Sequence, residues 1–478
     1  MLDTLSAAKI ADICGGVWTK APKTKLMGVQ IDSRAMRPSD LFIALPGTQA
    51  DGHEFVPHLN ALQHQAAIVA QPNNDCDVPQ LSVDRPLSAL KALASHIASE
   101  TTAQKIAVTG SVGKTGTKDM LLHCLAPMKR THATKGNLNN DIGAPLTIAR
   151  MRSDTDILIC ELGMNHAGEI TALSTLMKPA ISIITRIADS HRGHFNSLAD
   201  IARAKAEIFS GMSKEGIAIL PADDVHFDIL VAAAKQAGIT KIMTFGRQAD
   251  CDMRLIDQQL SEAQQTIQAN ICGTQISFTL GMAAPHWAYS ALICLGVVHH
   301  LGLSVQNAAD SLAVMRDIPG RGASFSAHID QNLVSIVNDA YNAGPASMEA
   351  ALALLATQSG RKSAILSDML ELGDLAPEAH QALAGQIVSA GITTLLLIGP
   401  FMAEMASQLP RDIIVTNIAD ADSAKAAAKK LAATSDHLLI KGSHGSGAWK
   451  LASYLQEFMP ADMSSTVAHM KKGGSDAT

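Results

Sequence analysis

Short apolar runs alternate with longer amphipathic stretches through the middle of the chain. The runs Ile106–Thr109, Asp156–Cys160, Ile181–Thr185 and Ile217–Leu220 read as strands, and a loop or helical stretch follows each one. Strands that alternate with helices in this way are typical of a parallel sheet covered by helices. We therefore predict an α/β fold whose centre is a mostly parallel sheet.

The alternation restarts after Pro319 and Gly320, which mark a break between elements. The unit that follows spans roughly 130–140 residues, a normal size for a domain. Its expected strands are Leu333–Val337, Ala364–Ser367, Thr394–Ile398, Ile413–Val415 and Leu438–Ile440. Before residue 85 the strand-like runs are shorter, as in Leu41–Leu45 and Ala67–Ala70, and turn-rich segments separate them.

These changes in the length and spacing of the strand-like runs predict three domains. The first two are a small α/β N-terminal domain at 1–85 and a central domain with a mostly parallel sheet at 86–317. A C-terminal α/β domain is expected at 318–460, and the polar segment 461–478 is expected to be a disordered tail. A chain of 478 residues is also too long for one hydrophobic core, which agrees with several domains.

Composition excludes several classes of protein. Hydrophobic residues make up 47% of the chain and charged residues 17%, which is typical of a soluble globular protein. The net charge of -6 disfavours wrapping of nucleic acid, although it leaves room for phosphate ligands at a local positive site. We expect neither a signal peptide nor a membrane span, which needs roughly 18 apolar residues. The seven cysteines form no Cys-x-x-Cys pair, so we expect reduced thiols in a cytoplasmic protein and no zinc site.

A glycine-rich loop between an expected strand and an expected helix indicates a phosphate ligand, and this setting disfavours a chance glycine-rich turn. Glycines allow backbone N–H groups to close around phosphate oxygens, and the helix N-terminus adds a positive dipole. Lys114 adds a charge, and the Thr115 hydroxyl can hold Mg²⁺. Val108 stands where the longer Walker A motif has glycine, so this is the shorter form. The residues expected to contact the nucleotide are Gly110, Ser111, Val112, Gly113, Lys114, Thr115 and Gly116.

Two polar residues follow the next strands of the expected sheet. Glu161 ends one strand, and His191 comes after the next. Residues at the carboxyl ends of neighbouring parallel strands face one crevice, which is where the phosphate loop also lies. A single loop histidine is more often structural than a ligand, but the shared crevice favours a divalent-cation site. Lys205 stands beside Glu207 on an expected helix, and from spacing alone this pair indicates a solvated helix face.

An ordered set of residue blocks extends from residue 32 to residue 443. Together with the phosphate loop, this set resembles the Mur ligase family over nearly the whole chain, although no single block is decisive. The blocks are Asp32-Ser33-Arg34, Asp51-Gly52-His53, Lys135-Gly136-Asn137-Leu138-Asn139-Asn140, Glu161-Leu162-Gly163-Met164-Asn165-His166, Ala204-Lys205-Ala206-Glu207, Gly320-Arg321-Gly322, Tyr341-Asn342-Ala343, Asp368-Met369-Leu370-Glu371-Leu372-Gly373 and Lys441-Gly442-Ser443.

The resemblance implies three domains and one type of reaction. An N-terminal domain would hold the UDP end of the substrate, a central P-loop ATPase would bind ATP and Mg²⁺, and a Rossmann-like C-terminal domain would bind the incoming amine. The reaction would join a carboxylate to an amine through an acyl phosphate. The blocks at 137–140, 161–166 and 341–343 are most similar to the members that add D-alanyl-D-alanine to UDP-N-acetylmuramoyl-tripeptide during peptidoglycan precursor synthesis. The Asp-Asn-Pro-Arg motif usual in the diaminopimelate-adding members is absent from the sequence.

The resemblance also implies roles for single residues. Lys114 would contact the β- and γ-phosphates, Thr115 would hold one Mg²⁺, and Glu161 and His191 would hold metal near the transferring phosphate. Lys205 would be carbamoylated by CO₂, so that it becomes an anion able to bind a second Mg²⁺. These assignments make Lys114, Glu161, His191 and Lys205 the expected catalytic set.

The remaining expected contacts lie farther from the phosphates. Arg321 would reach the γ-phosphate and Asp339 the ribose from across a domain gap, although either could be an ordinary surface or strand-end residue. The stretch that begins at His286 is similar to a segment near the adenine. The substrate contacts expected from the resemblance are Ser33 and Arg34 at the uridine diphosphate, and Asn137, Asn165 and His166 nearer the reacting end.

Several positions depart from the usual family pattern, and they leave two alternatives open. Gly116 replaces a threonine, and Arg186, Ser290 and Gly344 each replace an asparagine. One alternative is a sister ligase that adds a single amino acid; a folylpolyglutamate synthase is disfavoured because it lacks the region matching residues 32–53. The other is a nucleotide-binding homologue with weakened or lost catalysis. Only small-molecule substrates are expected as partners, and a monomer is expected.

Overall fold

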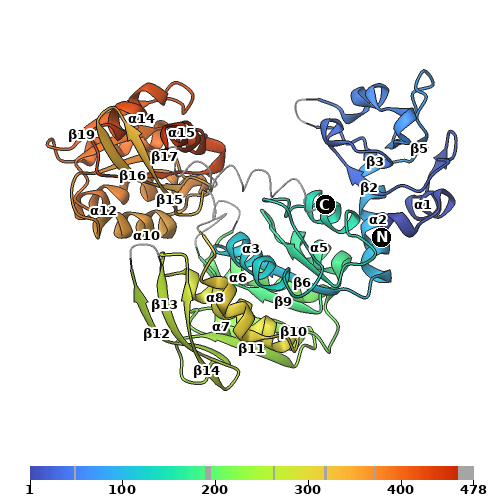
Figure 1. Cartoon of the computed structure of the whole chain (residues 1–478), viewed down its shortest axis with the longest axis horizontal. Coiled ribbons are helices and arrows are strands. Elements are labelled where there is room, and N and C mark those ends of the chain that lie inside the picture. Colours follow the sequence, from blue (N-terminus) through green and yellow to red (C-terminus); the bar gives the residue numbers. More distant parts are fainter. Residues whose placement is uncertain (48–49, 189–194, 262–263, 317–319, 371, 461–478) are drawn as a thin grey trace.

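The computed structural model describes residues 1–47, 50–188, 195–261, 264–316, 320–370 and 372–460. Three sheets form three bodies, with the N-terminal and C-terminal bodies at opposite ends of the central one (Figure 1). The predicted α/β class is confirmed. His191 and the tail 461–478 lie outside the described residues. Among the described helices, none combines the length and the apolar character that crossing a membrane requires.

The N-terminal body is a five-stranded sheet in the order β1-β5-β4-β3-β2, parallel except for β1. Its elements are α1 (Ala7–Cys14), β1 (Val17–Trp18), β2 (Gly28–Gln30), β3 (Asp40–Ile43), β4 (Ala66–Val69) and β5 (Gln80–Ser82). Every residue of β3 and β4 is buried, because both faces of the sheet are covered. One of these faces shares a continuous apolar core with the central body through α2 (Pro86–Glu100).

The central body has a nine-stranded sheet in the order β14-β13-β12-β11-β10-β9-β6-β8-β7. The strands from β7 to β12 in this order are parallel, and β13 and β14 add an antiparallel meander. The strands are β6 (Gln104–Thr109), β7 (Thr131–Ala133), β8 (Ile157–Glu161), β9 (Ile181–Ile184), β10 (Ile217–Pro221), β11 (Lys241–Gly246), β12 (Met253–Leu260), β13 (Gln265–Ile271) and β14 (Thr274–Leu280).

Helices cover both faces of this sheet. Because side chains alternate along a strand, Ile106 and Val108 of β6 enter one core while Ala107 enters the other. The helices are α3 (Lys114–Leu125), α4 (Gly143–Ala149), α5 (Glu169–Met177), α6 (Leu198–Ala206), α7 (Phe227–Gln236), α8 (Trp287–His300) and α9 (Val305–Leu312). The most apolar stretch of the chain is α8, which is buried on all sides against α3, α9 and the meander.

The C-terminal body is a six-stranded sheet in the order β15-β16-β20-β17-β18-β19, parallel except for β15. Its strands are β15 (Ala323–Ile329), β16 (Asn332–Asp339), β17 (Lys362–Ser367), β18 (Thr394–Ile398), β19 (Ile414–Ile418) and β20 (His437–Lys441). Its helices are α10 (Pro345–Ala356), α11 (Ala376–Gln381), α12 (Leu383–Ser389), α13 (Pro400–Met405), α14 (Lys425–Ala432) and α15 (Ala448–Leu455). All five strands expected here are present, and β15 is an addition that the sequence analysis missed.

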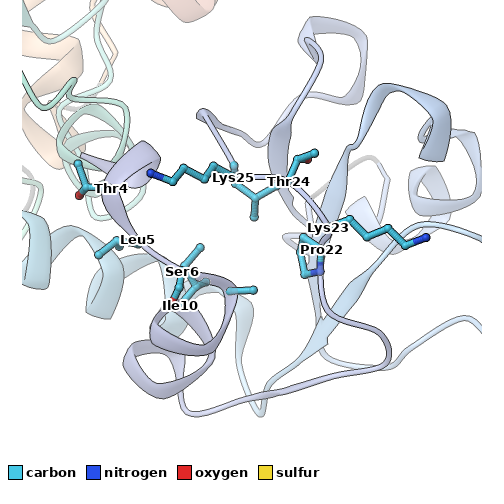
Figure 2. Close-up of a pocket in the computed structure, with 10 residues that line it drawn as sticks. Thr4, Leu5, Ser6, Ile10, Pro22, Lys23, Thr24 and Lys25 are labelled. Carbon is cyan, nitrogen blue, oxygen red and sulfur yellow. The ribbon is translucent and has the colours of Figure 1, made fainter.

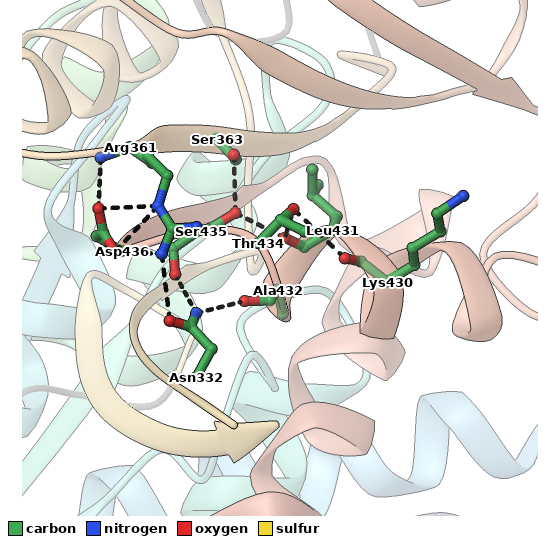
Figure 3. A network of polar contacts seen from close by, with 9 residues as sticks. All are labelled: Asn332, Arg361, Ser363, Lys430, Leu431, Ala432, Thr434, Ser435 and Asp436. Atoms are coloured by element: carbon green, nitrogen blue, oxygen red, sulfur yellow. Dashed lines mark hydrogen bonds and ion pairs between the residues drawn. The ribbon is translucent and has the colours of Figure 1, made fainter. Parts of the chain in front are cut away.

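A polar network closes the end of the C-terminal sheet where β17 and β20 begin (Figure 3). Arg361 forms an ion pair with Asp436 at 2.6 Å and donates a further hydrogen bond to Asn332. The Asn332 amide donates to the carbonyls of Ala432 and Ser435. The hydrogen bonds from Arg361 hold the pKa of the Asp436 carboxyl at about 2. The network therefore joins the β15–β16 turn to the loop before β20.

Two glycines offer a test of how tightly α8 packs. In α8, a Cβ on Gly296 would lie 1.8 Å from Sδ of the fully buried Met253 in β12. In α12, Gly385 is exposed, and a Cβ there would meet nothing within 4 Å. Alanine favours a helix over glycine by roughly 0.5–1 kcal/mol, whereas overpacking a core costs about 1–3 kcal/mol.

We therefore expect Gly385→Ala to raise the thermal midpoint of the protein and Gly296→Ala to lower it. Circular dichroism during heating measures both changes. Equal stabilisation by the two substitutions would show that α8 is not packed against β12 as described.

Candidate nucleotide and metal site

A cleft of about 2790 Å³ lies between the central and C-terminal bodies, and it contains most of the residues predicted to carry the chemistry. A smaller pocket of about 270 Å³ lies in the N-terminal body, between the start of α1 and residues 22–26 (Figure 2). There Lys25 extends toward Thr4, while Lys23 points away from the pocket. The small pocket lacks acidic and histidine side chains, so the large cleft is the candidate site.

The phosphate loop joins β6 to α3, as the sequence predicted. Gly110 and Gly113 adopt φ values of 148° and 86°, which favour glycine. A Cβ at Gly110 would lie 2.0 Å from Oγ1 of Thr185, at the end of the neighbouring strand β9. The Thr185 hydroxyl donates to the Val112 carbonyl at 2.6 Å, and the Ser111 N–H donates to the Arg186 carbonyl at 2.7 Å. Strand β9 therefore fixes the shape of the loop.

Three parts of the chain meet at the start of α3. The Thr115 hydroxyl donates to Oε2 of Glu161 at 2.7 Å, and Nη2 of Arg321 donates to the Thr115 hydroxyl at 2.8 Å. The Asn139 amide donates to Oε1 of Glu161 at 2.7 Å. Glu161 is 1% exposed, so these partners balance a buried carboxylate. Asn137 was the predicted contact and lines the cleft, but the hydrogen bond to Glu161 comes from Asn139, which the sequence analysis gave no role.

Lys114 lies over the loop, with its amine 2.6 Å from the Gly110 carbonyl and 3.2 Å from that of Ser111. This arrangement places a cation beside the N-terminus of α3, where phosphate oxygens would bind. Thr115 and Glu161 supply oxygen donors of the kind that Mg²⁺ prefers. Among the described residues, no three His, Cys, Asp or Glu side chains converge on one point, so a metal here would also need phosphate oxygens or water.

Lys205 is fully buried in α6, and its amine has no hydrogen-bond partner among the described residues. The solvated helix face indicated by spacing alone is therefore wrong. Burial lowers the pKa of this amine well below its ordinary value, and the Lys114 cation lowers it further. The carboxylates of Glu161, Glu207 and Glu169 oppose this shift. A buried amine whose pKa is lowered loses its proton more easily than an ordinary lysine, and the deprotonated amine is a nucleophile.

The C-terminal body contributes a second polar group to the cleft. Asp339 and Lys441 end the neighbouring parallel strands β16 and β20, and they form an ion pair at 2.5 Å. Lys441 is 1% exposed and also donates to the Asn342 carbonyl at 3.2 Å. The guanidinium of Arg321 stacks 4.1 Å above the Tyr341 ring. Lys441 therefore holds Asp339, and the sequence analysis assigned it no role.

His286 faces these groups from the central body. Its side chain reaches solvent, yet the cleft walls surround it, and this enclosure lowers the pKa of His286 to about 4. Asp339 opposes the shift, while Lys441 and Arg321 add to it. The imidazole is therefore neutral near pH 7, where one ring nitrogen can donate and the other can accept.

The other predicted contacts are more dispersed. Asn165 lines the cleft, and its N–H donates to Glu169, whereas His166 is exposed beside it. Ser33 and Arg34 lie in the N-terminal body, away from this cleft, and the Arg34 side chain is 88% exposed while paired with Asp32. The predicted metal ligand His191 falls outside the described residues.

Three of the four positions that depart from the family pattern have local explanations, and Arg186 has none. Gly116 packs beneath the Trp287 ring, which would overlap any side chain at that position. The Ser290 hydroxyl shares a 3.0 Å hydrogen bond with Thr117, which joins α8 to α3. Gly344 is the N-cap of α10, where its N–H donates to the Ser347 hydroxyl at 3.0 Å.

Comparison with protein families covers all three bodies. Residues 25–98 match the Mur ligase family catalytic domain, residues 108–298 the Mur ligase middle domain, and residues 326–444 the Mur ligase glutamate ligase domain. The three matches follow one another along the chain in the order that the sequence resemblance implied.

Individual relatives and solved structures agree with these matches. The UDP-N-acetylmuramoyl-tripeptide--D-alanyl-D-alanine ligase of Rickettsia prowazekii is 34% identical over 90% of this chain and 95% of its own length. The ligase of the same name from Bacillus subtilis is 32% identical over 92% and 95%. A crystal structure of MurF from Acinetobacter baumannii superposes with a TM-score of 0.81 at 28% identity, covering 95% of this chain and 98% of the other. The chain therefore belongs to the Mur ligase family.

Proposed function

We propose that this chain is an ATP-dependent ligase that joins D-alanyl-D-alanine to UDP-N-acetylmuramoyl-tripeptide in the cytoplasm, as a step of peptidoglycan precursor synthesis. The names of the relatives at 34% and 32% identity support the choice of substrates. The observation that carries the proposal is the contact of Arg321 with Thr115, which brings a cation from the C-terminal body to the phosphate loop. A related MurF ligase from Thermotoga maritima was solved with ADP, which supports ATP as the nucleotide.

The first step would form an acyl phosphate. A carboxylate oxygen of the tripeptide attacks the γ-phosphorus of ATP, the bond to the bridging oxygen breaks, and ADP leaves. Two anions approach each other in this step, so the site must supply positive charge. Lys114, Arg321 and the N-terminus of α3 lie where they can do so. Mg²⁺ held by Thr115 and Glu161 would neutralise phosphate charge when bound.

The second step would form the amide. The dipeptide amine attacks the acyl carbon, the tetrahedral intermediate expels phosphate, and the nitrogen loses a proton. The amine would approach from the C-terminal side of the cleft, where the buried Lys441 forms an ion pair with the partly exposed Asp339. Arg321 bridges the two bodies, so closure of the cleft would assemble the reacting groups and exclude water.

Lys205 would act after modification. Its buried amine, with its lowered pKa, would attack CO₂ in the deprotonated form, lose a proton and become a carbamate, which is an anion. That anion would lie near Lys114 and could hold a second Mg²⁺ as the sequence resemblance implied. Ser33 and Arg34 are proposed to contact the uridine diphosphate, because Arg34 is open to solvent on the N-terminal body.

The first prediction concerns the reaction itself. Purified protein with ATP, Mg²⁺ and UDP-N-acetylmuramoyl-tripeptide should release phosphate only when D-alanyl-D-alanine is present, with a UDP-pentapeptide as product. Phosphate assay and mass spectrometry measure the two outcomes. Release with a single amino acid and a shorter UDP-peptide would assign the chain to a sister ligase. ATP binding without release for any amine would contradict catalysis.

A second prediction concerns Arg321. Arg321→Met should lower kcat by roughly 100-fold or more, because a donor aimed at developing phosphate charge is lost. Arg411→Met is a matched control, since it removes an exposed arginine of the same body outside the cleft. Steady-state kinetics on both variants measure the effect. If Arg321→Met keeps the wild-type kcat, Arg321 does not stabilise the transition state.

A third prediction uses the lowered pKa of Lys205. In CO₂-depleted buffer, the unfolded chain binds a proton on Lys205 at pH values where the folded chain does not. The stability of the wild type should therefore rise with pH between the lowered folded pKa and the unfolded value of 10.5, more steeply than that of Lys205→Met. Urea unfolding at several pH values measures the difference.

Addition of bicarbonate should then increase the activity of the wild type and leave the inactive Lys205→Met variant unchanged. Nuclear magnetic resonance with ¹³C-labelled bicarbonate detects a carbamate directly. Identical pH slopes for the two proteins would contradict a neutral buried amine. Full wild-type activity in CO₂-depleted buffer would contradict the carbamate, but it would not contradict the lowered pKa of Lys205.

A further inference from the structure

Arg186 follows β9, the strand that fixes the shape of the phosphate loop. Strands β9 and β6 are parallel neighbours in the central body (Figure 1), and the loop follows β6. The Arg186 carbonyl accepts a hydrogen bond from the Ser111 N–H of the loop at 2.7 Å. The next N–H along the chain, that of Ile187, donates to the Asp224 carboxylate at 2.9 Å. The backbone at Arg186 is therefore held against the loop on one side and against Asp224 on the other.

The Arg186 side chain, in contrast, is held by no protein group that the structure describes. It is exposed and lines the cleft between the central and C-terminal bodies. Within the described ranges, its guanidinium has no hydrogen-bond partner and no carboxylate within 4 Å. An unpaired arginine on an open surface is ordinarily solvated, so the position of this one inside the cleft is what calls for an explanation.

Other cations lie in the same part of the cleft. The pKa of His286, which enclosure lowers to about 4, is lowered further by three positive groups, namely Lys441, Arg321 and Arg186. The Asp339 carboxylate opposes this shift, but it already forms an ion pair with Lys441. Among the groups that act on His286, positive charge therefore exceeds negative charge. Such an excess in a partly enclosed cleft favours an anionic ligand.

The place of Arg186 in the sheet indicates which anion this is. Strand β6 has two neighbours, β8, which ends in Glu161, and β9, which leads to Arg186. The proposed metal ligand thus flanks the phosphate loop on one side and Arg186 flanks it on the other. Asn137 and Asn165, the predicted contacts of the second substrate, follow β7 and β8 and so belong to the Glu161 side. A guanidinium binds phosphate oxygens through two parallel N–H donors.

We propose that Arg186 is a phosphate-binding residue for the nucleotide, whose phosphate chain it contacts from the β9 side of the loop. The proposal rests on the proposed function, which supplies ATP as the nucleotide. Arg186 replaces an uncharged asparagine of the usual family pattern, so it adds a cation to those of Lys114 and Arg321. Because Arg186 lies on the opposite side of the loop from Glu161, its contact serves binding in the ground state and the transition state alike.

Arg186→Asn tests the proposal by removing the charge and keeping a polar side chain. With both other substrates absent, we expect this variant to bind Mg-ADP and Mg-tripolyphosphate each about tenfold or more weakly than the wild type, because hydrogen bonds to a charged group are lost. Arg186→Lys keeps the charge without the forked donor, so its affinities should lie between the two. Isothermal titration calorimetry on the full chain measures all of these affinities.

Arg247→Met is the matched control, since it removes an exposed arginine of the central body outside the cleft lining. It should bind both ligands as the wild type does, and circular dichroism checks that each variant is folded. Unchanged affinities of Arg186→Asn for both ligands would overturn the proposal. Weaker binding of Mg-ADP alone would also overturn it, because the contact would then be with the nucleoside.

Salt dependence gives an independent measurement. The ratio of the Mg-ADP affinities of the wild type and Arg186→Asn should shrink when salt is raised from about 0.05 M to about 0.5 M, because an exposed charge contact is screened. Arg247→Met and the wild type should keep equal affinities over the same range. A ratio for Arg186→Asn that does not change with salt would contradict a contact between charges.

Steady-state kinetics separate binding from the chemical step. Arg186→Asn should raise the KM for ATP by about tenfold and leave kcat and the KM for the UDP-linked substrate unchanged. A lowered kcat with an unchanged KM for ATP, or a rise confined to the KM for the UDP-linked substrate, would contradict the proposal. The calorimetry needs neither the acceptor nor the amine. A protein that binds Mg-ADP through Arg186 but does not ligate D-alanyl-D-alanine would therefore contradict the proposed function and leave this inference standing.

Discussion

The hydrogen bonds from Arg321 through Thr115 to Glu161 are the constraint on which the cleft depends. Glu161 can reach Thr115 because β8 and β6 are neighbouring parallel strands that end at the same edge of the sheet. Arg321 can reach it because it lies just before β15, the edge strand of the C-terminal sheet, and lines the same cleft. The site is thus assembled from the ends of two separate sheets, and each sheet alone would hold only part of it.

The repeated strand and helix pattern made most of this architecture predictable. The phosphate loop, Glu161 and the later strands followed from apolar runs and glycine placement. The three-domain division followed from the changing strand pattern along the chain, and the family resemblance implied the same division. The meander of β12 to β14 was missed because its strands alternate buried and exposed residues, so they lack the continuous apolar runs of the parallel strands. Strand β15 was missed for the same reason, since it is an edge strand with several polar residues.

Side-chain partners were harder to predict than strands. Asn139 and Lys441 belonged to recognised blocks, but nothing in their spacing shows which residue bonds to Glu161 or Asp339. The burial of Lys205 depends on how α6 packs. A lysine close to a glutamate gives the same sequence pattern on a buried helix face as on a solvated one. Trp287 and Gly116 are 171 positions apart in the sequence, and only the packing of α8 on α3 shows that they share one space.

The apolar cores divide the molecule unevenly. The N-terminal and central bodies share one continuous core, whereas the buried clusters of the C-terminal body contain only its own residues. The contact of Arg321 with Thr115 between the central and C-terminal bodies is a polar one. A movement of the C-terminal body against the central one would therefore break no shared apolar core, whereas a movement of the N-terminal body would. The shared core therefore makes the N-terminal and central bodies one structural unit, and the C-terminal body a second unit that meets it across the cleft.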